Sequence, residues 1–209
     1  MNIFYILIST ILYAISFPEF SFWWFSFVSL IPFFFVLDNS DSASKNFFYG
    51  ILWGVGHALG MGYWAFFTIL NHYEVSFATS VLFFSLCIII PVTLIYTLFA
   101  LLYRFLHRNQ LFFYALVVPS LWILAEYLKE VVSFLIPWGG IECALVPFLE
   151  FIQIADVTGG YGVIFIAVVI NSLFVYFIKH LKPCGAVRLL KIKVPIMYTR
   201  LLLLTYFFC

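Results

Sequence analysis

The chain has 209 residues, of which 66% are hydrophobic and 9% are charged, and its formal net charge is +1. An ordinary globular domain has roughly 25% charged residues, so this composition excludes a protein with a fully water-facing surface. The small net charge and the lack of like-charge runs exclude nucleic acid and acidic proteins as partners.

Long apolar stretches between polar breaks predict helices that cross a membrane. Such a helix needs about 20 mostly apolar residues. We therefore predict an all-α polytopic membrane protein with six transmembrane helices plus a truncated seventh and no soluble domain. Because the seventh helix is truncated, we expect either that the chain is a fragment or that it ends inside the membrane. The stretches are 3–17, 22–37, 47–70, 77–105, 111–135 and 161–178, with the partial one at 196–209.

The first two stretches are each shorter than a full span, and Pro18 lies between them. Because each covers less than the ~30 Å hydrocarbon core, we expect a hairpin that neighbouring helices support. The amino terminus lacks the charged region and cleavage site of a signal peptide. We therefore expect 3–17 to be a retained helix.

Lysine and arginine residues gather in alternate connections between the stretches. Short, positively charged loops stay on the cytoplasmic side of a membrane, which predicts a cytoplasmic N-terminus. Lys129 is then the cation toward the outer face. The cations placed inside are Lys45, Arg104, Arg108, Lys179, Lys182, Arg188, Lys191, Lys193 and, at the start of the partial stretch, Arg200.

Residues 136–160 are too apolar for an ordinary loop, but Pro137, Gly139, Gly140 and Pro147 interrupt any continuous helix. Non-helical backbone at membrane depth persists only where protein or water satisfies its amides. We therefore predict a re-entrant or interfacial segment between the fifth and sixth helices. We expect the functional site there, on the outer side.

Small residues recur at every fourth position in the third stretch, at Gly50, Gly54, Ala58 and Gly62. A row of this kind lets two helix backbones approach closely. We interpret it as a helix-packing seam rather than a substrate groove. His57 beside it is interpreted as an interhelical hydrogen-bonding residue rather than a catalyst.

Glu126, Lys129 and Glu130 interrupt the otherwise apolar fifth stretch. Charges at membrane depth are costly and usually paired, and Glu126 and Lys129, at i and i+3, share one helix face. Structural pairing near the outer interface and a role in holding a charged headgroup both stay open at this point. Asn171 in the sixth stretch is predicted to hydrogen-bond between helices.

The sequence offers no self-sufficient active site. Its four cysteines lack the short spacing of a zinc or redox site. It has no nucleophile elbow, no His-Glu-x-x-His and no phosphate-binding Gly-x-x-x-x-Gly-Lys. No sequence neighbour would activate the thiol of Cys143. We therefore predict no catalytic residue, no metal site and no cofactor in this chain.

Four stretches, in order, resemble the amino-terminal membrane part of the apolipoprotein N-acyltransferases of bacterial inner membranes. The family's small polar pattern is poorly kept at 139–143. The stretches are Phe17-Pro18-Glu19-Phe20-Ser21-Phe22-Trp23 with Ser29-Leu30-Ile31-Pro32, Gly50 to Trp64, Pro119 to Lys129 with Ile136-Pro137-Trp138, and Gln153-Ile154-Ala155-Asp156 with Gly159-Gly160-Tyr161-Gly162 and Asn171-Ser172.

The resemblance implies transfer of an acyl chain from a membrane phospholipid to the N-terminal diacylglyceryl cysteine of a lipoprotein, through a cysteine thioester. In the family that cysteine belongs to a nitrilase-like domain beyond the seventh helix. The present chain is therefore expected to be inactive alone and to need that domain, which could be separately encoded. The residues expected to line or support the outer mouth of a lipid-facing cavity are Glu126, Lys129, Pro137, Trp138, Asp156 and Tyr161.

Two other functions stay open, a small transporter or channel subunit and a lipid-binding membrane scaffold. A transporter places polar residues along several helices, whereas few occur here and no internal repeat is evident. A dedicated scaffold would have no associated nitrilase-like sequence.

Overall fold

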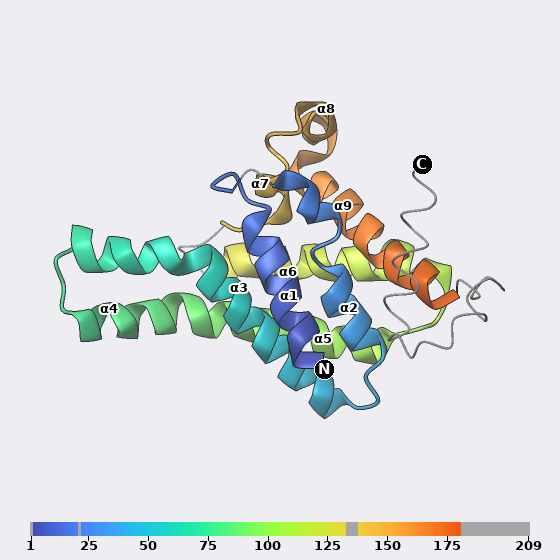
Figure 1. Cartoon of the computed structure of the whole chain (residues 1–209), viewed down its shortest axis with the longest axis horizontal. Coiled ribbons are helices and arrows are strands. Elements are labelled where there is room, and N and C mark those ends of the chain that lie inside the picture. The colour runs from blue at the N-terminus through green and yellow to red at the C-terminus, as the bar shows by residue number, and fades with distance from the viewer. Residues whose placement is uncertain (1, 21, 133–137, 181–209) are drawn as a thin grey trace, which may run out of the picture.

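The computed structural model describes residues 2–20, 22–132 and 138–180, and regular structure among them is entirely helical (Figure 1). The predicted all-α class is therefore confirmed for this part of the chain. In chain order the elements are α1 (Asn2–Ile15), the 3-10 helix η1 (Trp23–Phe27), α2 (Ile31–Asp38), α3 (Ala43–His72), α4 (Phe77–Phe84), the π-helical turn η2 (Ser85–Ile89), α5 (Ile90–Leu106), the π-helical turn η3 (Phe113–Val117), α6 (Val118–Val132), α7 (Ile141–Ala144), α8 (Leu149–Ile152) and α9 (Ala155–His180).

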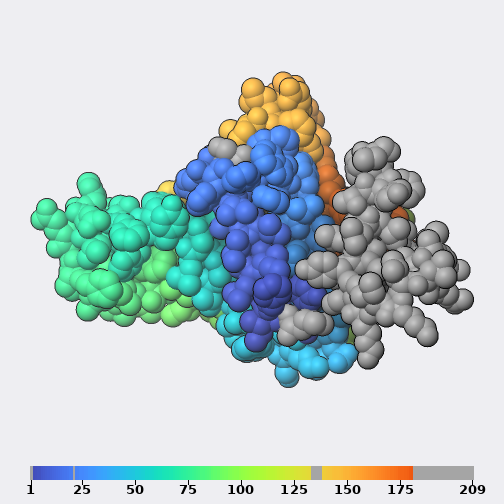
Figure 2. Space-filling view, in the orientation of Figure 1, coloured from blue at the N-terminus to red at the C-terminus, as the bar shows by residue number. Residues whose placement is uncertain are grey.

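One long helical hairpin projects from a central bundle. α3 packs along the α4–η2–α5 run, and the connected ends of the two extend away from the other helices in Figures 1 and 2. We call this projecting part, residues 64–88, the arm. α1 packs against α2 and α3, and α6 packs against α5 and α9. Within the arm, α3 therefore packs mainly against α4 and η2.

The glycine row of α3 faces α5. A Cβ atom added to Gly50 would lie 2.6 Å from Thr97 Cα, and one added to Gly54 would lie 2.7 Å from Thr93 Cα. Both distances are far inside van der Waals contact, so any larger residue would push the helices apart. Gly62 lies in the same way over a side chain of η2, and Ala58 between them is buried.

Two helical runs among the described residues are long and apolar enough to cross a membrane. They are Phe77–Leu106, which unites α4, η2 and α5, and Ala155–His180, which is α9. α1 and the η1–α2 region are shorter apolar helices. The other predicted spans stay predictions, and the partial seventh at 196–209 lies outside the described residues.

The apolar stretch 22–37 is two elements rather than one helix. Pro32 lies in the first turn of α2, where its missing N–H is harmless, whereas inside a continuous helix it would break a hydrogen bond. Asn171 of α9 satisfies the interrupted backbone. It accepts from Leu30 N at 3.0 Å and donates to Ser26 O at 2.8 Å. The predicted interhelical role of Asn171 is therefore confirmed.

Each π-helical turn lies just before a proline. Pro91 follows η2 and Pro119 follows η3 by two residues each. A proline inside a helix cannot donate to the carbonyl four residues earlier, and its ring collides with that carbonyl. The carbonyl belongs to Cys87 in η2 and to Ala115 in η3, where the widened π turn makes room for the ring. Both helices therefore continue through their prolines.

The chain between α6 and α9 contains two short helices of four residues each, α7 and α8. They lie together at one end of the bundle in Figure 1. α9 begins at Ala155, earlier than the predicted start at residue 161, and kinks at Gly159, whose φ of 68° lies in the left-handed region that favours glycine. No further long helix forms within residues 138–154.

Candidate functional site

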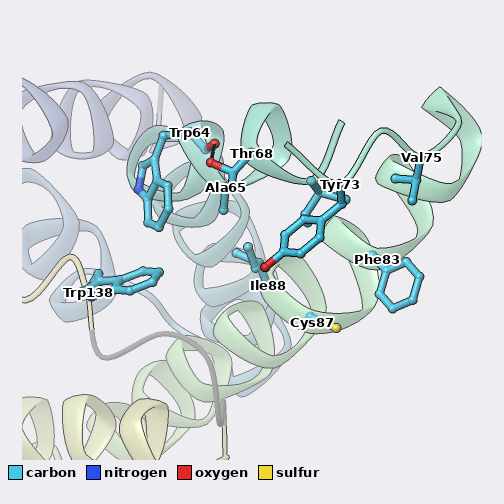
Figure 3. Close-up of a pocket in the computed structure, with 10 residues that line it drawn as sticks. Trp64, Ala65, Thr68, Tyr73, Val75, Phe83, Cys87, Ile88 and Trp138 are labelled. Atoms are coloured by element: carbon cyan, nitrogen blue, oxygen red, sulfur yellow. Dashed lines mark hydrogen bonds between the residues drawn. The ribbon is translucent and has the colours of Figure 1, made fainter. Parts of the chain in front are cut away.

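The arm and Trp138 enclose an apolar groove of about 440 Å³ (Figure 3). α3 supplies one wall, and α4 and η2 supply the other. The walls include Ala65, Ile69, Phe83 and Ile88. A long and almost wholly apolar groove of this size suits a hydrocarbon chain.

Trp64 and Trp138 form the boundary between this groove and a second, smaller cavity. Their ring centroids lie 4.6 Å apart, and both rings line both cavities. The smaller cavity, about 10 Å³, is close to the space that one water molecule needs. His57 and Lys129 line it, so polar groups lie on the far side of the two tryptophans from the groove.

Glu126 and Lys129 form a buried ion pair behind the two tryptophans. Their exposed fractions are only 2% and 1%. The hydroxyl of Tyr96 on α5 donates to Glu126 Oε1 at 2.8 Å. Removing two charges from water is costly, and only good geometry and further hydrogen bonds offset that cost. The pairing expected from the i, i+3 spacing is therefore present, and it is buried inside the protein.

His57 lies beside this pair with hydrogen-bonding capacity to spare. Its ring, 4% exposed, stacks on Trp53 with centroids 5.0 Å apart, and its Nε2 is 3.5 Å from the Tyr96 hydroxyl. Within the described residues, His57 Nδ1 and Trp122 Nε1 are buried without a hydrogen-bond partner. We call His57, Tyr96, Trp122, Glu126 and Lys129 the inner chamber.

Gly139, in the described part of the segment between α6 and α9, lies against the inner chamber, where a Cβ atom added to it would be 3.5 Å from His57 Nε2. The Tyr13 hydroxyl of α1 donates to the Gly139 carbonyl at 2.7 Å, and Gly139 has a φ of 84°, which favours glycine. Glu142 and Cys143 follow in α7, where the thiol lies 3.7 Å from Glu142 Oε1. This backbone turn brings a carboxyl group and a thiol near the chamber.

Burial, and then the negative charge of Glu126, raise the pKa of Glu142 to about 7. Burial, and then the charge of Glu142, raise the pKa of Cys143 to about 11. A thiol with a raised pKa is a poor nucleophile at neutral pH because the thiolate is the reactive form. The environment of Cys143 therefore does not activate its thiol.

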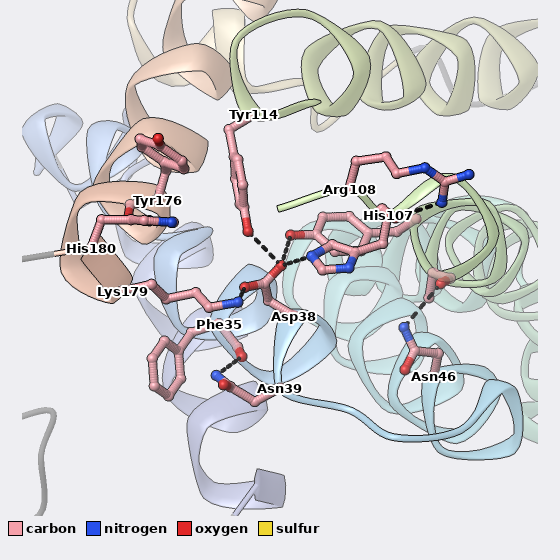
Figure 4. Close-up of polar contacts among 12 residues, drawn as sticks. Phe35, Asp38, Asn39, Asn46, His107, Arg108, Tyr114, Tyr176, Lys179 and His180 are labelled. Carbon is pink, nitrogen blue, oxygen red and sulfur yellow. Dashed lines mark hydrogen bonds and ion pairs between the residues drawn. The ribbon is translucent and has the colours of Figure 1, made fainter. Parts of the chain in front are cut away.

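A separate polar cluster surrounds Asp38 at the opposite end of the bundle from α7 (Figure 4). Its carboxylate has no exposed surface. Asp38 Oδ1 accepts from the Tyr103 hydroxyl at 3.1 Å and the Tyr114 hydroxyl at 2.8 Å, and lies 2.6 Å from His107 Nε2. Asp38 Oδ2 pairs with Lys179. We call these five residues the Asp38 cluster.

Burial alone would raise the pKa of Asp38, but the hydrogen bonds and charges of His107 and Lys179 lower it below its ordinary value. Two further cations lie close by. Lys45 pairs with Asp41 at 3.0 Å, and Arg104 donates to the Asp41 carbonyl at 3.2 Å. Three cations that the sequence places on the inner side therefore meet at this end of the bundle.

Three of the six expected cavity residues come together in the structure. Lys129 lines the smaller cavity, Glu126 pairs with it, and Trp138 lines both cavities. Pro137 lies outside the described residues. The roles of Glu126, Lys129 and Trp138 in binding lipid stay predictions.

The remaining two expected residues lie on α9, away from the described walls of both cavities. Asp156 is exposed in the first turn of α9. The Tyr161 hydroxyl donates to Glu130 Oε2 at 2.7 Å, so this carboxylate turns outward instead of competing with Glu126 for Lys129.

Sequence reasoning missed Tyr96 and Trp122 as chamber residues and Tyr13 as the donor to Gly139, and it gave Glu142 no role. The aromatic residues sit in apolar helices where the sequence has many others like them, so no local signal distinguishes them. Glu142 could have been noticed as a carboxylate in an apolar, glycine-interrupted segment. The described residues hold no group of three metal-ligating side chains.

Comparison with known proteins gives two matches. The sequence model of the apolipoprotein N-acyltransferase N-terminal domain matches residues 9–173. The apolipoprotein N-acyltransferase of Wigglesworthia glossinidia brevipalpis is 26% identical over 169 residues, which cover 78% of this chain and 32% of that protein. The chain thus spans about a third of the length of this curated relative.

Proposed function

The chain belongs to the family of apolipoprotein N-acyltransferase N-terminal domains, and from this we propose that it is a lipid-holding membrane domain for lipoprotein N-acylation. The acyl chain of a membrane phospholipid lies in the groove between the two sides of the arm. The polar part of the lipid lies toward Trp138 and the inner chamber. The acyl chain is destined for the N-terminal diacylglyceryl cysteine of a lipoprotein.

The observation that carries this proposal is the shared wall of Trp64 and Trp138. It places a buried ion pair directly behind an apolar groove, with only the two rings and their neighbours between them. Buried ionisable residues in a membrane domain usually serve a function, because their burial is costly. A lipid has the same two-part character, with an apolar chain joined to a polar head.

We further propose that the protein crosses the bacterial inner membrane several times with its N-terminus in the cytoplasm. The meeting of Lys45, Arg104 and Lys179 near the Asp38 cluster supports this orientation, because cytoplasmic ends carry the cations. α3 has 30 residues, about 45 Å at 1.5 Å per residue. The groove lies at the C-terminal end of α3, whereas Lys45 lies at its N-terminal end near the other cations. The groove is therefore far from the cation-rich end and toward the outer side.

The acyl-transfer step itself requires, on this proposal, a nitrilase-like catalytic domain. The raised pKa of Cys143 supports this, since its thiol is not activated. The groove and chamber then act by holding and orienting the acyl donor. Acceptor binding and thioester chemistry belong to the catalytic domain.

Quenching by lipids with dibrominated acyl chains tests the groove directly, because bromine quenches the fluorescence of a tryptophan it contacts. We expect a saturable component of quenching in detergent micelles that is lost in the Trp64→Phe/Trp138→Phe variant. Trp24→Phe, which removes an exposed ring outside the groove, is the matched control and keeps it. Saturable quenching that persists without both groove tryptophans would refute the proposal.

A cellular experiment tests the need for a catalytic domain. The 209-residue chain, expressed in bacteria depleted of their own N-acyltransferase, is expected to leave a reporter lipoprotein without its N-terminal acyl chain. Mass spectrometry of the reporter peptide measures this. Acylation by this chain alone would show that its own residues perform the transfer.

A further inference from the structure

An open cavity of about 610 Å³ lies where α1 and α3 begin, at the end of the bundle opposite α7 (Figure 1). The cavity and the apolar groove are thus at different ends of α3. The groove is almost wholly apolar, whereas this cavity has polar walls as well. Its lining residues are Asn2, Ile3, Ser44, Lys45, Phe48 and Tyr49. A cavity of this size and mixed character suits a small amphipathic ligand.

Tyr49 places an unused hydrogen-bond donor at the cavity wall. The residue is only 8% exposed, and its hydroxyl oxygen accepts from Asn2 Nδ2 at 2.8 Å. Because this bond joins two lining residues, the hydroxyl lies at the wall. A phenol can donate as well as accept, and no residue in the described part of the chain accepts this proton. An acceptor inside the cavity would satisfy it.

The N-terminus of α3 adds partial positive charge to the same wall. The first N–H groups of a helix lack partners within the helix and point outward from its end. The Ser42 hydroxyl satisfies one of them by accepting from Lys45 N at 3.3 Å. Ser44, in the first turn, lines the cavity. Backbone donors and a hydroxyl at the end of a 30-residue helix are suited to a phosphate group.

Lys45 supplies a full positive charge that its partner holds only weakly. Its Nζ lies 3.0 Å from Asp41 Oδ2, and both side chains are exposed. An exposed ion pair contributes little, so the ammonium group can turn to an anion in the cavity at small cost. Arg104 donates to the Asp41 carbonyl at 3.2 Å and brings a second cation. Lys45 and Arg104 together outweigh the single charge of Asp41.

An exposed apolar row leads away from the cavity along α1. Ile3 lines the cavity, and Leu7 and Ile11 follow at four-residue intervals, so the three share one helix face. All three are exposed, as is Phe48 on the α3 side of the cavity. A ligand with its polar part in the cavity can therefore lay hydrocarbon chains along this row.

We propose that this cavity binds an anionic phospholipid, with the phosphate against Lys45 and Tyr49 and the acyl chains along the row from Ile3. Basic pockets at membrane helix ends select anionic headgroups, because a zwitterionic headgroup carries its own cation. On the proposed orientation the lipid lies in the cytoplasmic leaflet. This inference goes beyond the proposed function and requires only that the chain lies in a membrane.

Native mass spectrometry of the whole chain released from micelles tests the site, because it resolves each bound lipid by mass. The titrants are phosphatidylglycerol and phosphatidylcholine with identical acyl chains. The first phosphatidylglycerol is expected to bind about tenfold more tightly than the first phosphatidylcholine. Lys45→Gln is expected to reduce this preference to about twofold. Arg108→Gln, which removes an exposed cation outside the cavity, is the matched control and keeps the preference.

Two results of this titration would overturn the site. One is equal binding of the two lipids. The other is an equal loss of preference in Lys45→Gln and Arg108→Gln, because the attraction would then come from the charged end as a whole. Glycerol 3-phosphate, which has the phosphate but no acyl chain, is expected to leave the bound lipid in place. Its displacement of the lipid at equal concentration would refute a role for the apolar row.

A second variant, Tyr49→Phe, tests the buried donor while keeping the aromatic ring. It is expected to weaken phosphatidylglycerol binding about fivefold and to leave phosphatidylcholine binding unchanged. A full preference in Tyr49→Phe, with unchanged thermal unfolding, would contradict the placement of the phosphate at this wall.

The groove variant Trp64→Phe/Trp138→Phe separates this site from the proposed function. It is expected to keep the preference for phosphatidylglycerol, because neither tryptophan lines the cavity. Loss of the preference in this variant would assign the anionic lipid to the groove and overturn the site at the start of α1 and α3. Loss of groove quenching alone leaves this site standing.

Discussion

The Asp38 cluster and the inner chamber are two buried polar groups at different ends of the same bundle, and they differ in how completely they are satisfied. The Asp38 carboxylate accepts hydrogen bonds from two tyrosine hydroxyls and pairs with the His107 imidazole and the Lys179 ammonium group. The inner chamber pairs Glu126 with Lys129 but leaves His57 Nδ1 and Trp122 Nε1 without described partners. The Asp38 carboxylate is therefore fully paired, whereas two ring nitrogens of the inner chamber remain able to hydrogen-bond to a ligand.

This difference shows how one apolar bundle can separate stability from binding. The Asp38 cluster joins α2, α5, η3 and α9, so its energy holds the fold. The inner chamber is separated from the apolar groove by Trp64 and Trp138, which line both the groove and the smaller cavity. Buried polar groups that lack partners are costly in an apolar interior, and such groups persist where a ligand uses them.

Replacing Asp38 is expected to cause the largest loss in the free energy of unfolding among these variants. Asp38→Asn leaves Lys179 and His107 without their carboxylate, and removing one member of a buried pair costs about 3–5 kcal/mol. Denaturant unfolding in micelles measures the free energy of unfolding. Asp41→Asn is the matched control, because its side chain is 84% exposed, and we expect a change of about 0.5 kcal/mol or less. Equal effects of the two substitutions would contradict a stabilising role for the Asp38 cluster.

Widening the α3–α5 seam tests whether the close approach of these two helices stabilises the bundle that carries both polar groups. Gly54→Val places atoms against the Thr93 backbone, and overpacking of this kind costs about 1–3 kcal/mol. Gly60→Ala is the milder control, because its new Cβ would lie 3.3 Å from the single methyl of Ala14. Thermal unfolding of both variants gives the difference. A fully stable Gly54→Val would mean that the close approach is not required.

Removing both charges of the inner chamber sharpens the contrast with Asp38. Glu126→Gln/Lys129→Met keeps an acceptor for Tyr96 and similar side-chain volumes. Replacing a buried pair with neutral groups is often neutral, or stabilising by about 1–4 kcal/mol. We therefore expect stability at least equal to that of the parent but weaker lipid quenching. A loss of stability as large as that of Asp38→Asn would show that the chamber is also structural.

The pH dependence of stability is expected to have opposite signs at the two ends. The pKa of Asp38 is lowered by folding, so its contribution is present above the unfolded value of about 3.9 and is lost as the pH falls through the folded pKa. The pKa of Glu142 is raised to about 7, so stability falls as the pH rises from about 4.3 to 7.

Unfolding measured across this range in single variants separates the two contributions. Glu142→Gln is expected to flatten the loss of stability toward neutral pH, and Asp38→Asn the loss below about pH 4. If Glu142→Gln leaves the profile unchanged, the carboxyl group is not perturbed by folding. This is the smallest of the expected effects, because Glu142 is partly exposed.

The sequence predicted what depends on neighbouring residues. The helical class follows from the apolar stretches, and the Glu126–Lys129 pair follows from an i, i+3 spacing. The Asp38 cluster was missed because Asp38 is separated from Tyr103 by 65 residues and from Lys179 by 141. Nothing in a local pattern indicates that such distant residues meet.

The same limit explains the misplaced element boundaries. Apolar stretches do not reveal where a helix is divided, so the sequence predicts one helix over 22–37, whereas α2 begins anew at Ile31 with Pro32 in its first turn. Asn171 was predicted to bond between helices, but its partners at the division could be found only in three dimensions. The predicted start of the last helix at residue 161 follows shortly after Gly159, whose non-helical backbone divides α9, while the short turn before it, from Ala155, was not predicted.

The π turn η2 also fixes which way α5 points. One extra residue in a regular α-helix rotates everything after it by about 100° about the axis, since a turn takes 3.6 residues. A widened π turn takes up the extra residue locally, so α5 keeps the angular setting that brings the phenol ring of Tyr96 to Glu126. If Ser85–Ile89 tightened to regular α-helical geometry without losing a residue, every side chain downstream would rotate away from its partners although none of them had changed.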